Sequence, residues 1–410
     1  MSVRLRAGLP LALAVLACTE PVGDPNQDLA DSVAVSAAGG RSAGRTAAVH
    51  WSGVASDLAR ERVAGSPEII RGFAILGVAQ YGAAITAERR RTRNVHPSVR
   101  AAVSAASAEV LAYLFPDAVN ESTVPLELFL DPDDRRRQRE NREAGESIGR
   151  DVAARVIEWA QSDRFLDPWT GTVPVGPGLW FSSSDPPAPP AGAAWGMARP
   201  ILLRSGDQFR LPPPPSFGSE AFLEGLAEVR RIFETRTPEQ DSIARFWSFV
   251  PGTDPGPTYW YDVAGDLAVR YSLGEAEAAH LFALMNATAF DALIASHDSK
   301  YTYWFIRPSQ ADPAIELAIG LPNHPSYPSN HGAISSASAG ILGAQFPRER
   351  RRLDGLADEA ALSRVYAGIH YRFDGDAGLQ LGRRVAAWAL KVDERFHKEG
   401  VEWLMSGRQE

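Results

Sequence analysis

The last third of the sequence contains an ordered series of basic, histidine and hydroxyl side chains of the kind that binds a tetrahedral oxyanion. Lysine and arginine would compensate the charge of such an anion, a serine hydroxyl would supply a fixed hydrogen bond, and an imidazole can attack or coordinate its central atom. In chain order these residues are Lys300, Arg307, Pro328-Ser329-Asn330-His331, Ser363-Arg364, His370 and Asp374. We therefore predict one buried oxyanion-binding site formed by this region.

Lys300 and Arg307 are seven positions apart, which would bring both to nearly the same face of one helix. We predict that this helix begins at a capping pair, Ser272 and Glu275, and ends near Arg307. A lysine and an arginine at this spacing commonly form a solvated stripe. The aromatic residues within 301–305 instead favour a buried helix whose two cations point into one cavity.

The tetrapeptide that ends in His331 precedes a run of small residues and is predicted to start a helix. Ser329, Asn330 and His331 would then occupy its first turn, where main-chain N–H groups and the helix dipole favour an anion. The alternative for Ser329 is the common role of a plain N-cap.

Arg364 and His370 are six positions apart, so one continuous helix would place them on different faces. We predict that Gly368 ends the helix between them and lets both turn inward. Asp374 lies four positions after His370 and would accept the Nδ1–H of its imidazole, which leaves Nε2 available as nucleophile or ligand. The alternative is an ordinary core histidine with a carboxylate partner.

The elements that must position these residues are predicted to be helices. Capping residues and apolar positions at spacings of three and four predict helices over about 67–81, 98–114 and 137–162, and again from Thr237. Strand alternation is scarce, so the fold class is all-α, a helical bundle. Residues 167–217 are too rich in proline for a regular helix or central strand, and we predict a long ordered loop. This loop would form either one wall of the pocket or a surface arm that only packs.

Composition limits the partners. The 410 residues are 45% hydrophobic, which is enough for a packed core, and their formal net charge is −8. Because no excess of positive charge is available to displace counterions from a phosphate backbone, we expect no nucleic-acid partner.

The N-terminus contains the one cysteine of the chain. Arg4 and Arg6 precede the apolar stretch 8–17, which is too short to span a bilayer and ends just before Cys18. This arrangement resembles a bacterial lipoprotein signal peptide with Cys18 as the acylated residue. The alternatives are ordinary secretion with cleavage elsewhere and a buried N-terminal helix.

The resulting domain prediction has three parts. Residues 1–17 would be the signal peptide, 18–48 a flexible linker, and 49–410 a single helical domain with its catalytic core at about 272–397. The protein would be exported and tethered at the periplasmic or cell-surface side, and its membrane contact would be the N-terminal lipid anchor alone.

Together the motifs resemble the three-part signature shared by vanadium-dependent haloperoxidases and the type 2 phosphatidic acid phosphatase superfamily. The proline-rich passage, at 176–180 and 204–209, is similar to soluble bacterial haloperoxidase-type members. The resemblance implies a helical bundle and vanadate as cofactor, with phosphate able to occupy the same site. It implies anion contacts from Lys300, Arg307, Ser329, the Asn330 amide and Arg364, an acid/base role for His331, and a vanadium ligand or phosphoryl-accepting nucleophile in His370.

Three functions follow from this resemblance. A haloperoxidase would use hydrogen peroxide, polarised by Lys300, to oxidise halide for transfer to a small organic acceptor. A phosphatase would hydrolyse a phosphomonoester through a phosphohistidine. The family has glycine where this chain has Asn330, so a non-catalytic oxyanion-binding lipoprotein is the third. His324 matches a histidine of algal bromoperoxidases, which implies a preference for bromide or iodide.

Overall fold

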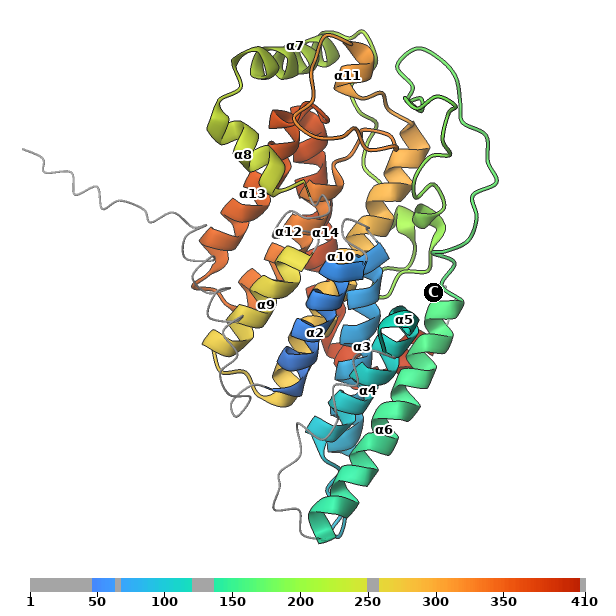
Figure 1. The fold of residues 1–410 in the computed structure, drawn as a ribbon, viewed down its shortest axis with the longest axis vertical. Coiled ribbons are helices and arrows are strands. Elements are labelled where there is room, and N and C mark those ends of the chain that lie inside the picture. The colour runs from blue at the N-terminus through green and yellow to red at the C-terminus, as the bar shows by residue number, and fades with distance from the viewer. Residues whose placement is uncertain (1–45, 63–67, 120–135, 249–257, 406–410) are drawn as a thin grey trace, which may run out of the picture. The chain divides into compact units, whose positions relative to one another are not determined.

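The computed structural model describes residues 46–62, 68–119, 136–248 and 258–405 (Figure 1). Within these ranges the regular structure is helical, apart from an isolated antiparallel bridge between Leu179 and Phe305, and the all-α prediction is confirmed. The described residues belong to one compact unit, Gly44–Glu410. The predicted signal peptide, Cys18 and the first residue of the helix predicted over 67–81 lie outside the described residues.

The first helices form one side of the bundle. They are α2 (Ala47–Arg62), α3 (Glu68–Arg89), α4 (Val99–Leu114), α5 (Pro116–Val119) and α6 (Arg136–Gln161). Ser98, the first residue of the helix predicted over 98–114, is the N-cap of α4, because its side chain accepts a hydrogen bond from the Ala101 N–H. Helix α2 begins inside the segment expected to be linker, and Glu275 caps it by accepting the N–H groups of Ala47 and Ala48, each at 2.9 Å.

The proline-rich segment is ordered and contains the short helices η2 (Trp195–Met197) and η3 (Gly206–Phe209). It lies beside the C-terminal part of α10 (Glu275–Tyr303; Figure 1), and the Trp180 N–H donates to the Trp304 carbonyl at 2.6 Å. The Trp180 side chain is buried. The segment therefore packs on the helix that carries Lys300.

The remaining helices build the part of the bundle that contains the predicted site. They are α7 (Glu220–Thr235), α8 (Pro238–Phe246), α9 (Tyr259–Arg270), α10, α11 (Pro308–Ala311), α12 (Asn330–Gln345), α13 (Arg350–Tyr366), α14 (Arg372–Glu399) and α15 (Glu402–Met405). Helix α10 packs on α3 and α12, and α12 packs on α13 and α14. Helices α3 and α10 are long and apolar enough to cross a membrane, but 89% and 94% of their most apolar windows are buried in the fold.

Glycines allow α14 to approach α12 closely. A Cβ at Gly378 would lie 2.4 Å from the Ser329 carbonyl oxygen, and one at Gly382 would lie 2.1 Å from that of Ala333. Any side chain at these positions would push the helices apart. The contact brings the start of α14, which carries Asp374, against the start of α12, which carries Ser329; the Ser329 N–H donates to the Asp374 carbonyl at 2.9 Å.

Two predictions about α10 were wrong. The N-cap is Gly274, whose N–H donates to Glu277 at 2.8 Å, whereas Ser272 adopts a left-handed conformation with φ 52°. The helix ends at Tyr303 because Trp304 is also left-handed, with φ 49° and ψ 36°. Lys300 and Arg307 therefore do not lie on one helix, and the turn after Trp304 brings Arg307 towards the site.

Candidate active site

Three cationic side chains are fully buried in the region predicted to bind an oxyanion. Lys300 lies in the last turn of α10, Arg307 immediately precedes α11, and Arg364 lies in the last turn of α13; each has 0% exposed surface. Isolated charges are seldom buried in this way, because each loses its hydration. The position of all three in one part of the core is the central feature of the site.

The Lys300 ammonium is held by the loop that leads into α12. Its Nζ donates to the carbonyls of Pro325 at 2.9 Å, Ser326 at 2.8 Å and Pro328 at 2.5 Å. Burial, followed by the neighbouring charge of Arg307, lowers the pKa of Lys300 well below its ordinary value. Lys300 thus orders the 325–328 loop and would contact an anion directly only by exchanging one of these carbonyls.

Arg307 contacts two histidines, His370 and His324, near the 325–328 loop. Its Nη1 lies 3.1 Å from Nε2 of His370 and donates to the Ile369 carbonyl at 2.7 Å. Its Nη2 lies 3.0 Å from Nδ1 of His324, and its Nε donates to the His324 carbonyl at 3.0 Å. Burial lowers the pKa of Arg307 to about 10, so the guanidinium remains charged at neutral pH.

Arg364 has an unused donor. Its Nε donates to Ser363 Oγ at 2.9 Å and its Nη2 donates to the Ala244 carbonyl of α8 at 2.5 Å. Its Nη1 is buried and has no hydrogen-bond partner among the residues that the structure describes. Burial lowers the pKa of Arg364 to about 9. A buried guanidinium with an unsatisfied N–H is the side chain that a bound oxyanion would complete.

His370 and Asp374 form the predicted pair. Gly368 has φ 79° and ends α13, as expected, and the Nδ1 of His370 lies 2.9 Å from Oδ2 of Asp374. The same carboxylate oxygen accepts the Tyr371 N–H at 3.1 Å. Burial, together with the charges of Arg307 and Lys300, lowers the pKa of His370 well below its ordinary value, so the imidazole is neutral. Its Nδ1–H therefore donates to Asp374, and its Nε2 lone pair faces Arg307.

Ser326 is a member of the site that the sequence analysis missed. Its hydroxyl donates to Oδ2 of Asp374 at 2.5 Å and lies 3.4 Å from Nδ1 of His370. No sequence spacing indicates this role for Ser326, because its partner Asp374 lies 48 positions away.

The start of α12 contains Ser329, Asn330 and His331, as predicted. Ser329 is its N-cap and accepts the Gly332 N–H at 3.4 Å. His331 shares a hydrogen bond with the backbone of Trp247, and burial followed by the charge of Arg364 lowers its pKa. The Asn330 side chain is turned towards α10, where Ser296 Oγ donates to its Oδ1 at 2.6 Å and its Nδ2 donates to His297 Nε2 at 3.0 Å.

The charges of this site do not balance. In the described part of the chain, Asp374 is the carboxylate that interacts with both Lys300 and Arg307, and Arg364 has none beside it. Buried charge is stable only with a counter-charge or satisfied hydrogen bonds. The arrangement can bind an oxyanion between the arginines and the start of α12, next to the Nε2 lone pair of His370.

Known proteins resemble this chain in the region that carries the site. The sequence pattern of the PAP2 superfamily matches residues 278–398. A non-specific acid phosphatase of Providencia stuartii is 30% identical over 195 residues, which cover 46% of this chain and 75% of that protein. The chain belongs to the PAP2 superfamily. A non-specific acid phosphatase of Salmonella typhi is 28% identical over 193 residues, which cover 43% of this chain and 70% of the relative.

Solved structures of two bacterial vanadium enzymes share the fold of this PAP2 superfamily member. A vanadium-dependent iodoperoxidase superposes with a TM-score of 0.71 and 23% identity, covering 84% of this chain and 94% of the other. A vanadium-dependent chloroperoxidase superposes with a TM-score of 0.64 and 15% identity, covering 84% and 96%. The predicted superfamily and fold are therefore confirmed.

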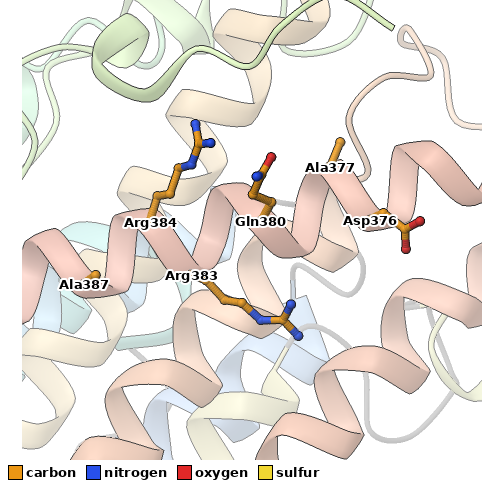
Figure 2. A pocket seen from close by; sticks show the side chains of 6 residues that line it. All are labelled: Asp376, Ala377, Gln380, Arg383, Arg384 and Ala387. Atoms are coloured by element: carbon orange, nitrogen blue, oxygen red, sulfur yellow. The ribbon is translucent and has the colours of Figure 1, made fainter. Parts of the chain in front are cut away.

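A surface depression within the PAP2 superfamily match is separate from the site. It has a volume of about 660 Å³ and lies along the exposed face of α14 (Figure 2), and its lining contains Asp376, Ala377, Gln380, Arg383, Arg384 and Ala387. Asp374 and Gly378 lie on the buried face of the same helix. The depression shares no lining residue with the predicted oxyanion site.

Proposed function

We propose that this PAP2 superfamily member is a vanadium-dependent haloperoxidase that oxidises halide with hydrogen peroxide, with bromide and iodide ahead of chloride. The observation that carries the proposal is the buried cluster of Lys300, Arg307 and Arg364 around a neutral His370. Its excess positive charge and the unsatisfied Nη1 of Arg364 fit a vanadate ion.

The residues that would hold vanadate come from four segments. The two arginines and Lys300 would compensate its charge, the Ser329 hydroxyl and the Asn330 N–H would donate hydrogen bonds, and His370 Nε2 would be the ligand. Vanadate, when bound, supplies an electrophilic centre that activates hydrogen peroxide towards halide. Ser326 and the Tyr371 N–H hold Asp374, which in turn fixes the Nδ1–H tautomer of His370.

His331 is the proposed acid/base group. Its imidazole is neutral, because burial and the charge of Arg364 lower its pKa. A neutral ring nitrogen can accept a proton from hydrogen peroxide as the peroxide binds, and the resulting imidazolium can return it to the departing oxygen. The charges of Arg364, Lys300 and Arg307 disfavour the imidazolium form of His331, so the ring readily gives this proton up.

The similarity of residues 176–180 and 204–209 to soluble bacterial haloperoxidase-type members supports this function over the alternative. The choice of bromide and iodide rests on His324, whose Nδ1 contacts Arg307 Nη2.

The second candidate is a phosphomonoesterase, which the 30% identity to an acid phosphatase favours. His370 Nε2 would attack phosphorus, the ester P–O bond would break, and His331 would protonate the departing alcohol. Water would then hydrolyse the phosphohistidine and release phosphate. Both candidates use the same residues, so the cofactor decides between them.

One paired assay tests the proposal. The purified protein with vanadate is tested for peroxide-dependent bromination and iodination of an activated diketone, and the vanadate-free protein for hydrolysis of an aryl phosphate. Vanadate-dependent halogenation supports the haloperoxidase, and hydrolysis alone supports the phosphatase. Retained oxyanion binding without either activity indicates a binding protein. His370→Ala should abolish the activity that is found; undiminished turnover in this variant would overturn the site assignment.

We propose further that the protein is exported and anchored by a lipid on Cys18, on the pattern of residues 4–18. The test compares Cys18→Ser with the natural chain in membrane and soluble fractions. A variant that stays equally membrane-associated contradicts the anchor.

A further inference from the structure

The Asn330 carboxamide has two partners on α10. Ser296 Oγ donates to its Oδ1 at 2.6 Å, and its Nδ2 donates to His297 Nε2 at 3.0 Å. All three side chains are buried, with 0%, 1% and 9% exposed surface for Ser296, His297 and Asn330. Because both ends of the amide are occupied, its orientation is fixed, and it points towards α10 at the first turn of α12.

The tautomer of His297 is fixed from the opposite side. Its Nδ1 lies 2.9 Å from the Gly192 carbonyl, so Nδ1 carries the proton and Nε2 holds the lone pair that accepts from Asn330. Burial, followed by the charge of Lys300, lowers the pKa of His297 to about 3, and the ring stays neutral. The carbonyl, the imidazole and the carboxamide therefore form one directed chain of hydrogen bonds.

Gly192 allows the proline-rich segment to come this close. Its φ is 69°, and a Cβ there would lie 2.7 Å from His297 Cε1 and 2.4 Å from Trp195 Cε3. Trp195 itself packs on His297 with ring centroids 4.7 Å apart. Hydrogen bonds of the His297 imidazole thus connect the proline-rich segment to Asn330 in the first turn of α12.

We propose that His297 is a positioning residue of the oxyanion site, which the Gly192 carbonyl orients and which, with Ser296, holds the Asn330 carboxamide away from the anion. The inference rests on the proposed oxyanion site. If the carboxamide were released, its oxygen would be a buried acceptor next in sequence to His331, on which the charge of Arg364 acts; Nη1 of Arg364 is an unsatisfied donor. The carboxamide oxygen would then compete with the anion for the same hydrogen bonds. Held towards α10, the residue offers the anion its main-chain N–H alone.

A double-mutant cycle tests this inference. The affinity of the full-length protein for inorganic vanadate and for phosphate is measured by titration calorimetry. We expect His297→Ala to weaken both about fivefold. In the Asn330→Gly background, which has no carboxamide to hold, the same substitution should have little effect. His297→Gln retains an acceptor near the position of Nε2 and should restore most of the affinity.

Gly192→Ala tests the same inference by a second route, and Thr288→Val is the control. Gly192→Ala displaces the His297 ring and should weaken binding as His297→Ala does, again only when Asn330 is present. Thr288→Val removes a buried hydroxyl of α10 that donates to the Leu284 carbonyl at 2.6 Å, within the helix, and should leave the affinity unchanged. Far-ultraviolet circular dichroism checks that each variant is folded.

The outcomes separate the inference from the proposed function. A natural protein that binds neither vanadate nor phosphate overturns the oxyanion site, and the inference with it. A natural protein that binds, together with equal losses on His297→Ala in both Asn330 backgrounds, overturns the positioning role alone. Failure of His297→Gln to recover affinity also counts against it.

Discussion

Nη1 of Arg307 lies 3.1 Å from Nε2 of His370, so the nitrogen that would meet the anion already faces a cation. Since Nδ1 of His370 donates to Asp374, Nε2 is an acceptor and the contact is a hydrogen bond from Arg307. A bound oxyanion can take over both groups at once, receiving the Arg307 N–H and the His370 lone pair. Without a ligand, the Arg307 donor and the His370 acceptor therefore satisfy each other.

Asp374→Asn should lower turnover by about 10- to 100-fold without unfolding the protein, because the neutral amide no longer fixes the His370 tautomer. Steady-state kinetics of the vanadate-loaded protein measure the effect. The control is Asp376→Asn, which changes an exposed carboxylate of the same helix. Equal losses in both variants would contradict the role of Asp374.

Between pH 7 and pH 5, protonation of Asp374 should stabilise the native state and at the same time lower turnover. Burial raises the pKa of Asp374 to about 6, although Ser326, Lys300 and Arg307 act in the opposite direction. In the unfolded chain an aspartate titrates near about 3.9. The native state therefore takes up this proton first as the pH falls, and protonation of Asp374 contributes about 1 kcal/mol of stability over this window. Turnover falls in this window because His370 loses its charged acceptor.

Urea unfolding and kcat measured on the same samples test this pH dependence. Relative to Asp374→Asn, the natural protein should gain stability as the pH falls. This comparison isolates Asp374 from the other buried carboxyls and from the buried histidines, whose lowered pKa values act in the opposite direction. If the stabilities of the natural protein and Asp374→Asn change equally between pH 7 and pH 5, the assignment is wrong.

Ser326→Ala should raise the pKa of Asp374 further, because the hydroxyl hydrogen bond stabilises the carboxylate. The acidic limb of the pH profile of kcat should then move to higher pH, and turnover at neutral pH should fall about tenfold. Ser338→Ala removes a buried hydroxyl of α12 outside the site and is the control. An unshifted acidic limb would count against Ser326.

Arg364→Met should make the ligand-free protein more stable by about 1 kcal/mol, since it removes a buried charge without a carboxylate partner. It should also abolish stabilisation by vanadate. In the natural protein we expect about 2.7 kcal/mol at a vanadate concentration one hundred times the Kd. Thermal unfolding with and without vanadate measures both effects, and Arg351→Met on the exposed face of α13 is the control. A variant that vanadate still stabilises would exclude Arg364 from the site.

Local parts of the site could be predicted because they depend on short spacings. The contact between His370 and Asp374 joins residues four positions apart, and the break at Gly368 uses a residue that readily adopts positive φ. The N-cap role of Ser329 is likewise a local property.

The remaining parts depend on contacts between distant segments. Helix α10 ends early because Trp304 adopts a left-handed conformation. The Trp304 carbonyl accepts a hydrogen bond from the N–H of Trp180 in the proline-rich segment. No pattern near Ser326 or His297 indicates their partners, Asp374 and Asn330, which lie 48 and 33 positions away. The roles of such residues can be recognised only in the folded structure.

The mutual burial of α3 and α10 has a consequence for biosynthesis. Each of these apolar helices covers the other, yet α3 leaves the ribosome long before α10 is made. Until then, α3 has α4 and α6 as its neighbours, and the face that α10 will occupy is open to chaperones and to aggregation. A nascent chain stopped before α10 should therefore be retained by chaperones, whereas one that extends past α14 should be released.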